Sequence, residues 1–380
     1  MLLFLVLFVG LFATFGAAVP RPSTFKVPTV SNVTIFVPPS DYNIPRTLYA
    51  HSLELPDGTL LATWENYSPE PPLVYFPIYK STDNGATWKH ISNVTDQTLG
   101  WGLRYQPSLH VLSQRIGRFP AGTVLLAGNA IPTDLNYTQI DLYASFNGGH
   151  SWKFVSHVAA GGEAVPDNGL TPVWEPYMLE YKGKLVIYYS DQRFSDYGQL
   201  LDHQVSGDLI NWSDPVFDVR YPTYTDRPGM ASLALLPNGE YIYTYEYGGG
   251  GNYSSYTFPV FYKRSKDPLL LDEVEGVQLI SQDGTEPSSS PYVTWSPVGG
   301  PNGTIIVTSA SNTEVFINRA LGDPNEWQTV ETGVAASYSR DVRALSGGRL
   351  LIMGGGVLSG ESNYVYASTF YVKDLIDSVN

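Results

Sequence analysis

Two glutamates, Glu175 and Glu246, have neighbours that could make them catalytic. Glu175 lies between a tryptophan and a proline, and Glu246 lies between two tyrosines, ahead of four consecutive glycines. Hydrolysis of a glycosidic bond uses two carboxyls flanking the bond, one protonated and one ionised. Apolar neighbours raise the pKa of a carboxyl, so Glu246 suits the acid/base role, and the reverse assignment of the two glutamates is an alternative. The alternative is that one or both only form salt bridges with Arg193, Arg227 or Arg340.

Metal or cofactor chemistry has little support in the sequence. There is no cysteine, and the six histidines lack the spacing of zinc ligands. The glycines 248–251 are not followed by a helical pattern, so they do not form a dinucleotide-binding motif. We expect no cofactor and no required catalytic metal.

A repeated unit must position the two glutamates. In each unit a polar or proline-containing start leads to an alternating apolar strand, a Gly-containing turn and a second apolar strand. Units start near residues 45, 107, 176, 228, 291 and 340, at intervals of about 62, 69, 52, 63 and 49 residues. This is the spacing of four-stranded blades, and no long helical periodicity interrupts it. The sequence therefore predicts an all-β, six-bladed β-propeller that forms a single domain over residues 19–380.

A second motif recurs later in the units. The segment 81–88 fits the Asp-box pattern Ser-x-Asp-x-Gly-x-x-Trp, the segment 145–152 repeats it with Asn for Asp, and 206–212 is a shortened copy. The Asp or Asn caps a tight turn and the glycine takes a positive φ. The strand-like stretch from Ser31 to Val37 precedes the first unit, and the sixth unit is one strand short. We expect this N-terminal strand to complete the sixth blade.

Strand direction assigns residues to the two ends of the central channel. If each first strand begins at one mouth, each second strand ends there, and the Asp boxes with Asp83 and Asp208 are structural on the far face. Other residues at this mouth include Trp64, Glu65, Arg104, Asp191, Arg193 and Asn312. The predicted catalytic residues are Glu175, Glu246 and Tyr338, and the predicted substrate-binding residues are Arg46, Tyr105, Trp174, Arg227, Tyr247 and Arg340.

Composition narrows the possible partners. The chain has 22 basic and 36 acidic residues, a net charge of −14, which disfavours nucleic acid. Only 15% of residues are charged, whereas 27 are Tyr and 8 are Trp, a composition that suits neutral sugars. We expect a monomer without membrane association.

The N-terminus predicts export. Residues 1–18 form an apolar run that ends in small residues, which is a signal-peptide pattern, although a retained anchor is an alternative. We therefore expect a secreted, extracellular protein held together by a large core rather than by disulfides. Seven Asn-x-Ser/Thr sequons agree with this route: Asn32, Asn66, Asn93, Asn136, Asn211, Asn252 and Asn302.

The Asp boxes, together with the segments 44–46, 174–176 and 245–248, resemble the sialidase-like superfamily and, within it, the fungal exo-arabinanases of glycoside hydrolase family 93. The resemblance runs from about residue 30 to the end. It implies release of arabinobiose from the non-reducing end of linear α-1,5-L-arabinan, a side chain of pectin, with retention of configuration. The family's two glutamates match Glu175 and Glu246. Glu175 would then be held ionised by an arginine and hydrogen-bonded by Tyr338.

Two other functions compete. A sialidase needs three arginines around a carboxylate and a tyrosine nucleophile, and Arg46, Arg227, Arg340 and Tyr338 could supply them. We find no convincing acidic partner soon after the first blade. A lectin-like propeller would keep the aromatic mouth without needing both glutamates.

Overall fold

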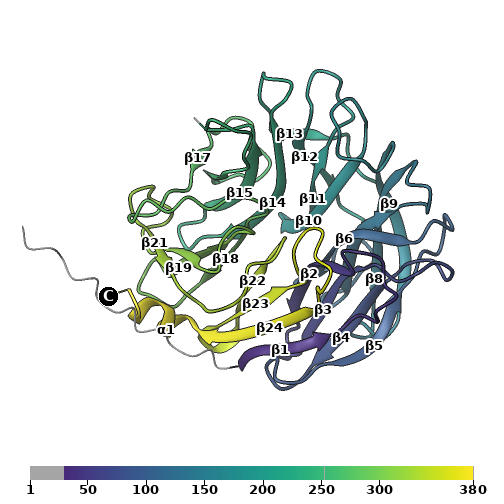
Figure 1. The fold of residues 1–380 in the computed structure, drawn as a ribbon, viewed down its shortest axis with the longest axis horizontal. Coiled ribbons are helices and arrows are strands. Elements are labelled where there is room, and N and C mark those ends of the chain that lie inside the picture. Colours follow the sequence, from purple (N-terminus) through teal and green to yellow (C-terminus); the bar gives the residue numbers. More distant parts are fainter. Residues whose placement is uncertain (1–29, 252, 380) are drawn as a thin grey trace, which may run out of the picture.

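The strands of the chain form six blades. A computed structural model describes residues 30–251 and 253–379, in which six four-stranded antiparallel sheets are arranged in a ring (Figure 1). This confirms the predicted all-β, six-bladed propeller. The first three blades comprise β2 (Thr47–Glu54), β3 (Leu60–Asn66), β4 (Phe76–Ser81) and β5 (Lys89–Val94); β6 (Leu103–Val111), β7 (Val124–Ala130), β8 (Thr138–Ser145) and β9 (Lys153–Gly161); and β10 (Val173–Tyr181), β11 (Lys184–Asp191), β12 (Leu200–Ser206) and β13 (Val216–Val219).

The sixth blade joins the two ends of the described chain. Strand β1 pairs antiparallel with β24 in register Val33↔Ala367, as Figure 1 shows at the edge of the ring, so the expected closure by the N-terminal strand is confirmed. A short 3-10 turn, η1 (Ser346–Gly348), and a C-terminal helix, α1 (Val372–Asp377), complete the fold. Blades four to six comprise β14 (Arg227–Leu235), β15 (Tyr241–Gly248), β16 (Val260–Ser265) and β17 (Val277–Gln278); β18 (Tyr292–Ser296), β19 (Thr304–Thr308), β20 (Val315–Asn318) and β21 (Trp327–Val330); and β22 (Asp341–Leu345), β23 (Arg349–Gly354), β24 (Val365–Tyr371) and β1 (Val30–Phe36).

The core consists of separate apolar layers between neighbouring blades. Each of six hydrophobic clusters joins two adjacent blades, for example Leu125 and Ile187 between the second and third, and Ile306 and Ile352 between the fifth and sixth. Each blade is thus buried against two neighbours, so the ring needs no disulfide to close.

The innermost strands of blades one to four share a β-bulge near their start. In β10 the register passes from Trp174↔Ser190 to Tyr177↔Tyr188, so Glu175 and Pro176 together face one residue of β11. The first bulged residue has a positive φ, 62° at Glu175. The equivalent residues in the other three blades are Tyr49, Gln106 and Met230, with φ of 45°, 56° and 59°. Such conformations cost about 1–3 kcal/mol each and cluster at functional sites.

The Asp boxes form the turns between the third and fourth strands. Asp83 Oδ1 accepts hydrogen bonds from Thr87 N at 2.9 Å and Ser81 Oγ at 2.8 Å, Gly85 has a φ of 88°, and Trp88 Nε1 donates to Gly85 O at 3.0 Å. Asn147 receives the equivalent bond from Ser151 N. Because these turns follow a strand that runs away from the mouth, they lie on the opposite face, as expected.

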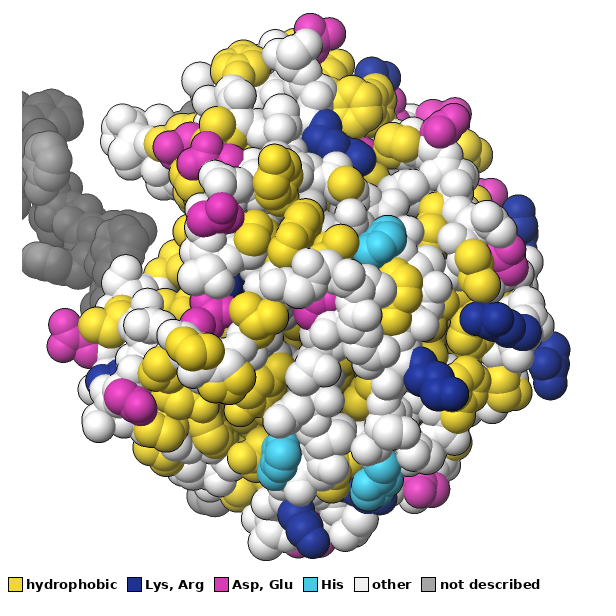
Figure 2. Space-filling view, turned by 90° about the vertical axis from the view of Figure 1, so that its right-hand side faces the viewer, with side chains coloured by type: hydrophobic (Ala, Val, Ile, Leu, Met, Phe, Trp, Pro, Cys, Tyr) yellow, Lys and Arg dark blue, Asp and Glu magenta, His cyan; other side chains and the backbone are white. Residues whose placement is uncertain are grey.

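The surface carries few charges. On the side shown in Figure 2, charged side chains stand singly or in small groups among uncharged ones. Within the described residues, no helix combines the length and apolarity needed to span a bilayer. The predicted signal peptide lies outside the described residues. Among the sequons, Asn66 is 3% exposed, whereas Asn32, Asn93, Asn136 and Asn211 are exposed.

Candidate active site

One large cavity opens among the starts of the innermost strands. Its volume is about 550 Å³, and its wall includes residues from blades one, two, three, four and six. Consecutive residues line it in three blades, Leu48 with Tyr49, Tyr105 with Gln106, and Trp174 with Glu175. In a regular strand consecutive side chains point to opposite faces, so the bulges turn the second residue of each pair toward the channel. Six predicted site residues lie in the wall: Tyr105, Trp174, Glu175, Arg227, Glu246 and Tyr338.

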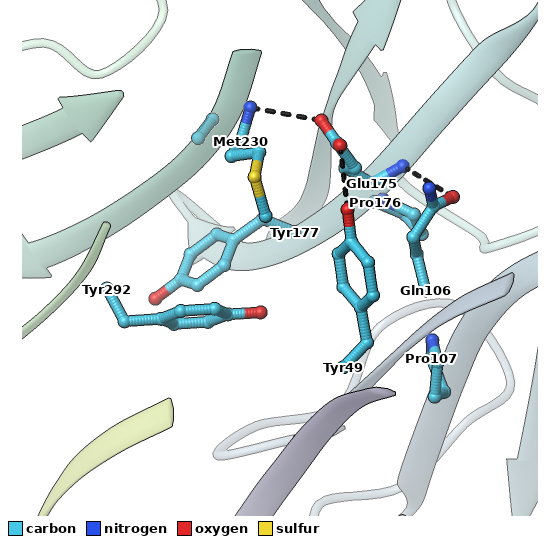
Figure 3. A pocket seen from close by; sticks show the side chains of 9 residues that line it. Tyr49, Gln106, Pro107, Glu175, Pro176, Tyr177, Met230 and Tyr292 are labelled. Atoms are coloured by element: carbon cyan, nitrogen blue, oxygen red, sulfur yellow. Dashed lines mark hydrogen bonds between the residues drawn. The ribbon is translucent and has the colours of Figure 1, made fainter. Parts of the chain in front are cut away.

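Glu175 lies at the floor of this cavity and accepts three hydrogen bonds. Oε1 accepts from the Tyr49 hydroxyl at 3.1 Å, and Oε2 accepts from Ser190 Oγ at 2.6 Å and Met230 N at 3.1 Å. Figure 3 shows the Tyr49 hydroxyl and the Met230 amide pointing at the carboxyl from two sides. Burial raises the pKa of Glu175, and the three donors together with the charge of Arg227 counteract that rise.

Glu246 is held by the blade that follows it. Its Oε2 accepts from Ser290 N at 2.7 Å and from Ser289 Oγ at 3.0 Å, and the residue is 7% exposed. Burial and the nearby charge of Glu175 raise the pKa of Glu246 to about 7. With two donors against three on Glu175, Glu246 is the carboxyl better suited to carry a proton near neutral pH.

Arg227 supplies positive charge without forming an ion pair with either glutamate. Its guanidinium donates to Gln192 Oε1 at 3.1 Å and Gln199 Oε1 at 2.7 Å, and also to Asn168. Its charge makes the rise in the pKa of both glutamates smaller than burial alone would cause. Within the described chain neither glutamate forms a salt bridge, which removes the purely structural alternative of a salt-bridge partner.

Aromatic rings line one side of the cavity. The ring centroids of Tyr67 and Tyr105 are 6.0 Å apart, and those of Tyr105 and Trp174 are 6.5 Å apart. Trp174 is oriented by a hydrogen bond from its Nε1 to Gln192 Oε1 at 2.9 Å. An aromatic wall beside buried carboxyls suits a ligand with apolar ring faces and hydroxyl edges, such as a sugar.

Three predicted substrate-binding residues lie outside the cavity wall. Arg340 follows the positive-φ residue Ser339 and points into the protein, where its fully buried guanidinium donates to the carbonyls of Thr313, Glu314 and Val334. Its position disagrees with the predicted substrate contact and indicates a structural role.

Arg46 and Tyr247 are also placed differently from the prediction. Arg46 donates to the carbonyl of Pro39 at 3.1 Å. Tyr247 is stacked on Tyr221 with ring centroids 3.7 Å apart and donates to Asp226 Oδ2, because strand alternation turns it away from the face that Glu246 occupies. Of the three arginines that a sialidase site would need, only Arg227 lines this cavity.

The tyrosine that contacts Glu175 is also not the one predicted. Tyr338 lies in the wall, but its hydroxyl is 3.4 Å from the hydroxyl of Tyr49, and it is Tyr49 that donates to the carboxyl. Nothing in the residues around Tyr49 signals a bulge, so its inward orientation was not predictable from alternation. Gln106 and Met230, at the equivalent bulges, were missed for the same reason. Ser190 on β11 and Ser289 before β18 were also missed, although neither lies in a bulge.

A third carboxyl, Glu65, lines the cavity from the first blade. It is 1% exposed and accepts hydrogen bonds from Gln106 N at 2.9 Å and from the Tyr67 hydroxyl at 2.7 Å. Burial raises its pKa to about 8. No group of three or more acidic, histidine or cysteine side chains in the described chain is placed to hold a metal.

A propeller that places two carboxyls, the buried Glu246 and the partly buried Glu175, in one aromatic cavity defines a class, that of propeller glycoside hydrolases. Comparisons with protein-family models and with curated proteins find no match. Among solved structures, an α-L-arabinanase from Penicillium chrysogenum in complex with arabinobiose is 55% identical, with a TM-score of 0.90, covering 91% of this chain and 99% of that one. The family 93 α-L-arabinofuranosidase of Fusarium graminearum, also with arabinobiose, is 51% identical at a TM-score of 0.90, with the same coverages.

The chain belongs to glycoside hydrolase family 93, as the resemblance implied, and is a glycoside hydrolase. A sialidase from Streptococcus pneumoniae matches at 12% identity and a TM-score of 0.60, covering 90% of this chain and 71% of that one, which shows the shared propeller fold alone.

Proposed function

We propose that this enzyme is secreted and hydrolyses linear α-1,5-L-arabinan, including the arabinan side chains of pectin, from one end to release arabinobiose. The observation that carries the proposal is the pair Glu175 and Glu246, which line one cavity from neighbouring blades and form no salt bridge within residues 30–251 and 253–379. The arabinobiose bound in two solved relatives supports the substrate and the product.

We propose a retaining, two-step reaction. Glu246 protonates the glycosidic oxygen while Glu175 attacks the anomeric carbon, which gives a covalent arabinobiosyl-enzyme and releases the shortened chain. Glu246 then removes a proton from a water molecule that attacks the same carbon, and Glu175 departs. The three donors to Glu175 favour its ionised form, and the higher pKa of Glu246 favours its protonated form.

Product analysis on linear arabinan tests the reaction. We expect arabinobiose from the first time points, little early loss of chain length, and retained anomeric configuration by NMR. Long oligosaccharides at early times would contradict attack from the chain end, and an inverted product would contradict the covalent intermediate. A fluorogenic sialoside is the control and should remain uncut.

Azide rescue separates the roles of the two glutamates. With an aryl arabinobioside whose leaving group departs without protonation, Glu246→Ala should accumulate the arabinobiosyl-enzyme, which azide converts to a glycosyl azide of retained configuration. Glu175→Ala should instead give the azide of inverted configuration. The reverse pattern would exchange the roles.

A further inference from the structure

Glu65 occupies the same place in the first blade as Glu246 does in the fourth. Glu65 pairs with Leu48, directly before the bulge of β2, and Glu246 pairs with Gly229, directly before the bulge of β14. Each carboxyl accepts the backbone N–H of the next blade, from Gln106 and Ser290 respectively. The first and fourth blades are opposite each other in a ring of six, so the two carboxyls approach the cavity from opposite sides.

Glu65 lacks a charged partner that would keep it ionised. It forms no salt bridge in the described chain, and Arg104, at the same mouth in the second blade, is bound to Glu70 at 3.0 Å. A carboxyl buried without a cation is more stable in its neutral form. Glu65 therefore carries a proton.

No hydrogen bond recorded among the described residues uses that proton. Both oxygens of Glu65 already accept, one from Gln106 N and one from the Tyr67 hydroxyl. If Glu65 instead donates to the Tyr67 hydroxyl across the 2.7 Å contact, the O–H of Tyr67 becomes free to donate to another group. Tyr67 lines the same cavity. In either arrangement the pair has one hydrogen-bond donor left over.

We propose that the Glu65–Tyr67 pair donates one hydrogen bond to a hydroxyl of the bound arabinose unit, on the side of the cavity opposite Glu246. This inference rests on the proposed function and makes Glu65 a substrate-binding residue. A neutral donor fits a neutral sugar, and ionisation of Glu65 removes it, since the carboxylate then accepts from Tyr67 and has nothing to donate.

The affinity of the Glu246→Gln variant for arabinobiose tests for this donor. The variant does not turn over substrate, and it lacks the carboxyl of Glu246, which would otherwise titrate in the same pH range. We expect the affinity to fall about tenfold between about pH 6 and about pH 9, through the pKa of Glu65 of about 8. The matched variant Glu246→Gln/Glu65→Gln keeps a neutral donor at every pH, so it should bind within about threefold of Glu246→Gln at about pH 6 and lose the alkaline fall.

A further variant removes both donors. Glu246→Gln/Glu65→Leu/Tyr67→Phe should bind arabinobiose at least about tenfold more weakly at about pH 6 if it folds, which its thermal unfolding shows. A pH-independent affinity of Glu246→Gln, or an alkaline fall that persists with Glu65→Gln, overturns the inference alone. Absence of arabinobiose binding by Glu246→Gln, with no cleavage of arabinan by the unaltered enzyme, overturns the proposed function and this inference with it.

Discussion

Glu65 and Glu246 have equivalent backbone positions but different neighbours across the preceding blade boundary. The blade before the fourth carries Glu175 at its bulge, whereas the blade before the first carries Ser339 at the corresponding positive-φ position. The charge of Glu175 raises the pKa of both carboxyls. For Glu246 this charge is second only to burial, whereas the pKa of Glu65 responds more to the hydrogen bonds from Tyr67 and Gln106. The propeller buries a carboxyl at either place. At the fourth blade, the acid at the preceding bulge, Glu175, completes the proposed catalytic pair.

The sequence predicted the blades and the face of the propeller that carries the cavity well. Repeat spacing and alternation predicted the blades, the closing strand and the face that holds Glu175 and Glu246, because these depend on patterns that recur along the chain. The direction in which individual side chains point at the mouth was less predictable. A bulge inserts one residue and reverses the alternation beyond it, so Tyr49 points inward. Arg340 precedes β22 and follows the positive-φ residue Ser339, and its side chain points into the protein. Neither orientation has a local sequence signal.

Removing either catalytic carboxyl should have the largest effect. Glu175→Gln and Glu246→Gln should each lower kcat on arabinan by about a thousandfold or more, because the amide can neither attack nor transfer a proton. Glu326→Gln, at an exposed glutamate between β20 and β21, is the control and should match the unaltered enzyme. An equal loss in Glu326→Gln would mean that the effect does not come from the cavity.

The pH profile should separate the two glutamates of the pair. As an acid, Glu246 must be protonated, so kcat/KM should fall about tenfold per pH unit above its pKa of about 7. Glu175 must be ionised, so activity should also fall as the pH drops below its raised pKa. Initial rates across the pH range measure both limbs, and an activity maximum well above about pH 8 would contradict the assigned acid.

Gly229 has no side chain, which leaves space beside Glu175 and Glu246. A Cβ there would lie 2.8 Å from Gln199 Nε2 and 3.5 Å from both Glu246 Oε1 and the Ser190 hydroxyl that donates to Glu175. Gly229→Ala should therefore lower kcat/KM about tenfold by displacing these groups, with little change in melting temperature. Gly207→Ala, where a Cβ meets nothing within 4 Å, is the control and should match the unaltered enzyme.

The smallest effect on activity should come from changes in the Asp boxes, which lie on the face opposite the cavity. Asp83→Ala removes the acceptor for Thr87 N–H and should lower the free energy of unfolding by about 1 kcal/mol, while kcat and KM stay unchanged. Asp83→Asn keeps that acceptor, as Asn147 does in the second box, and should recover most of the stability.

The Thr87 bonds also lower the pKa of Asp83, so the difference between the aspartate and alanine forms should shrink as the pH falls through that lowered pKa. Chemical denaturation of the three proteins, with arabinan kinetics beside it, measures this. An activity loss in Asp83→Ala without a stability loss would mean that the two faces of the propeller are coupled, and the sharp division between a structural face and a catalytic mouth would have to be abandoned.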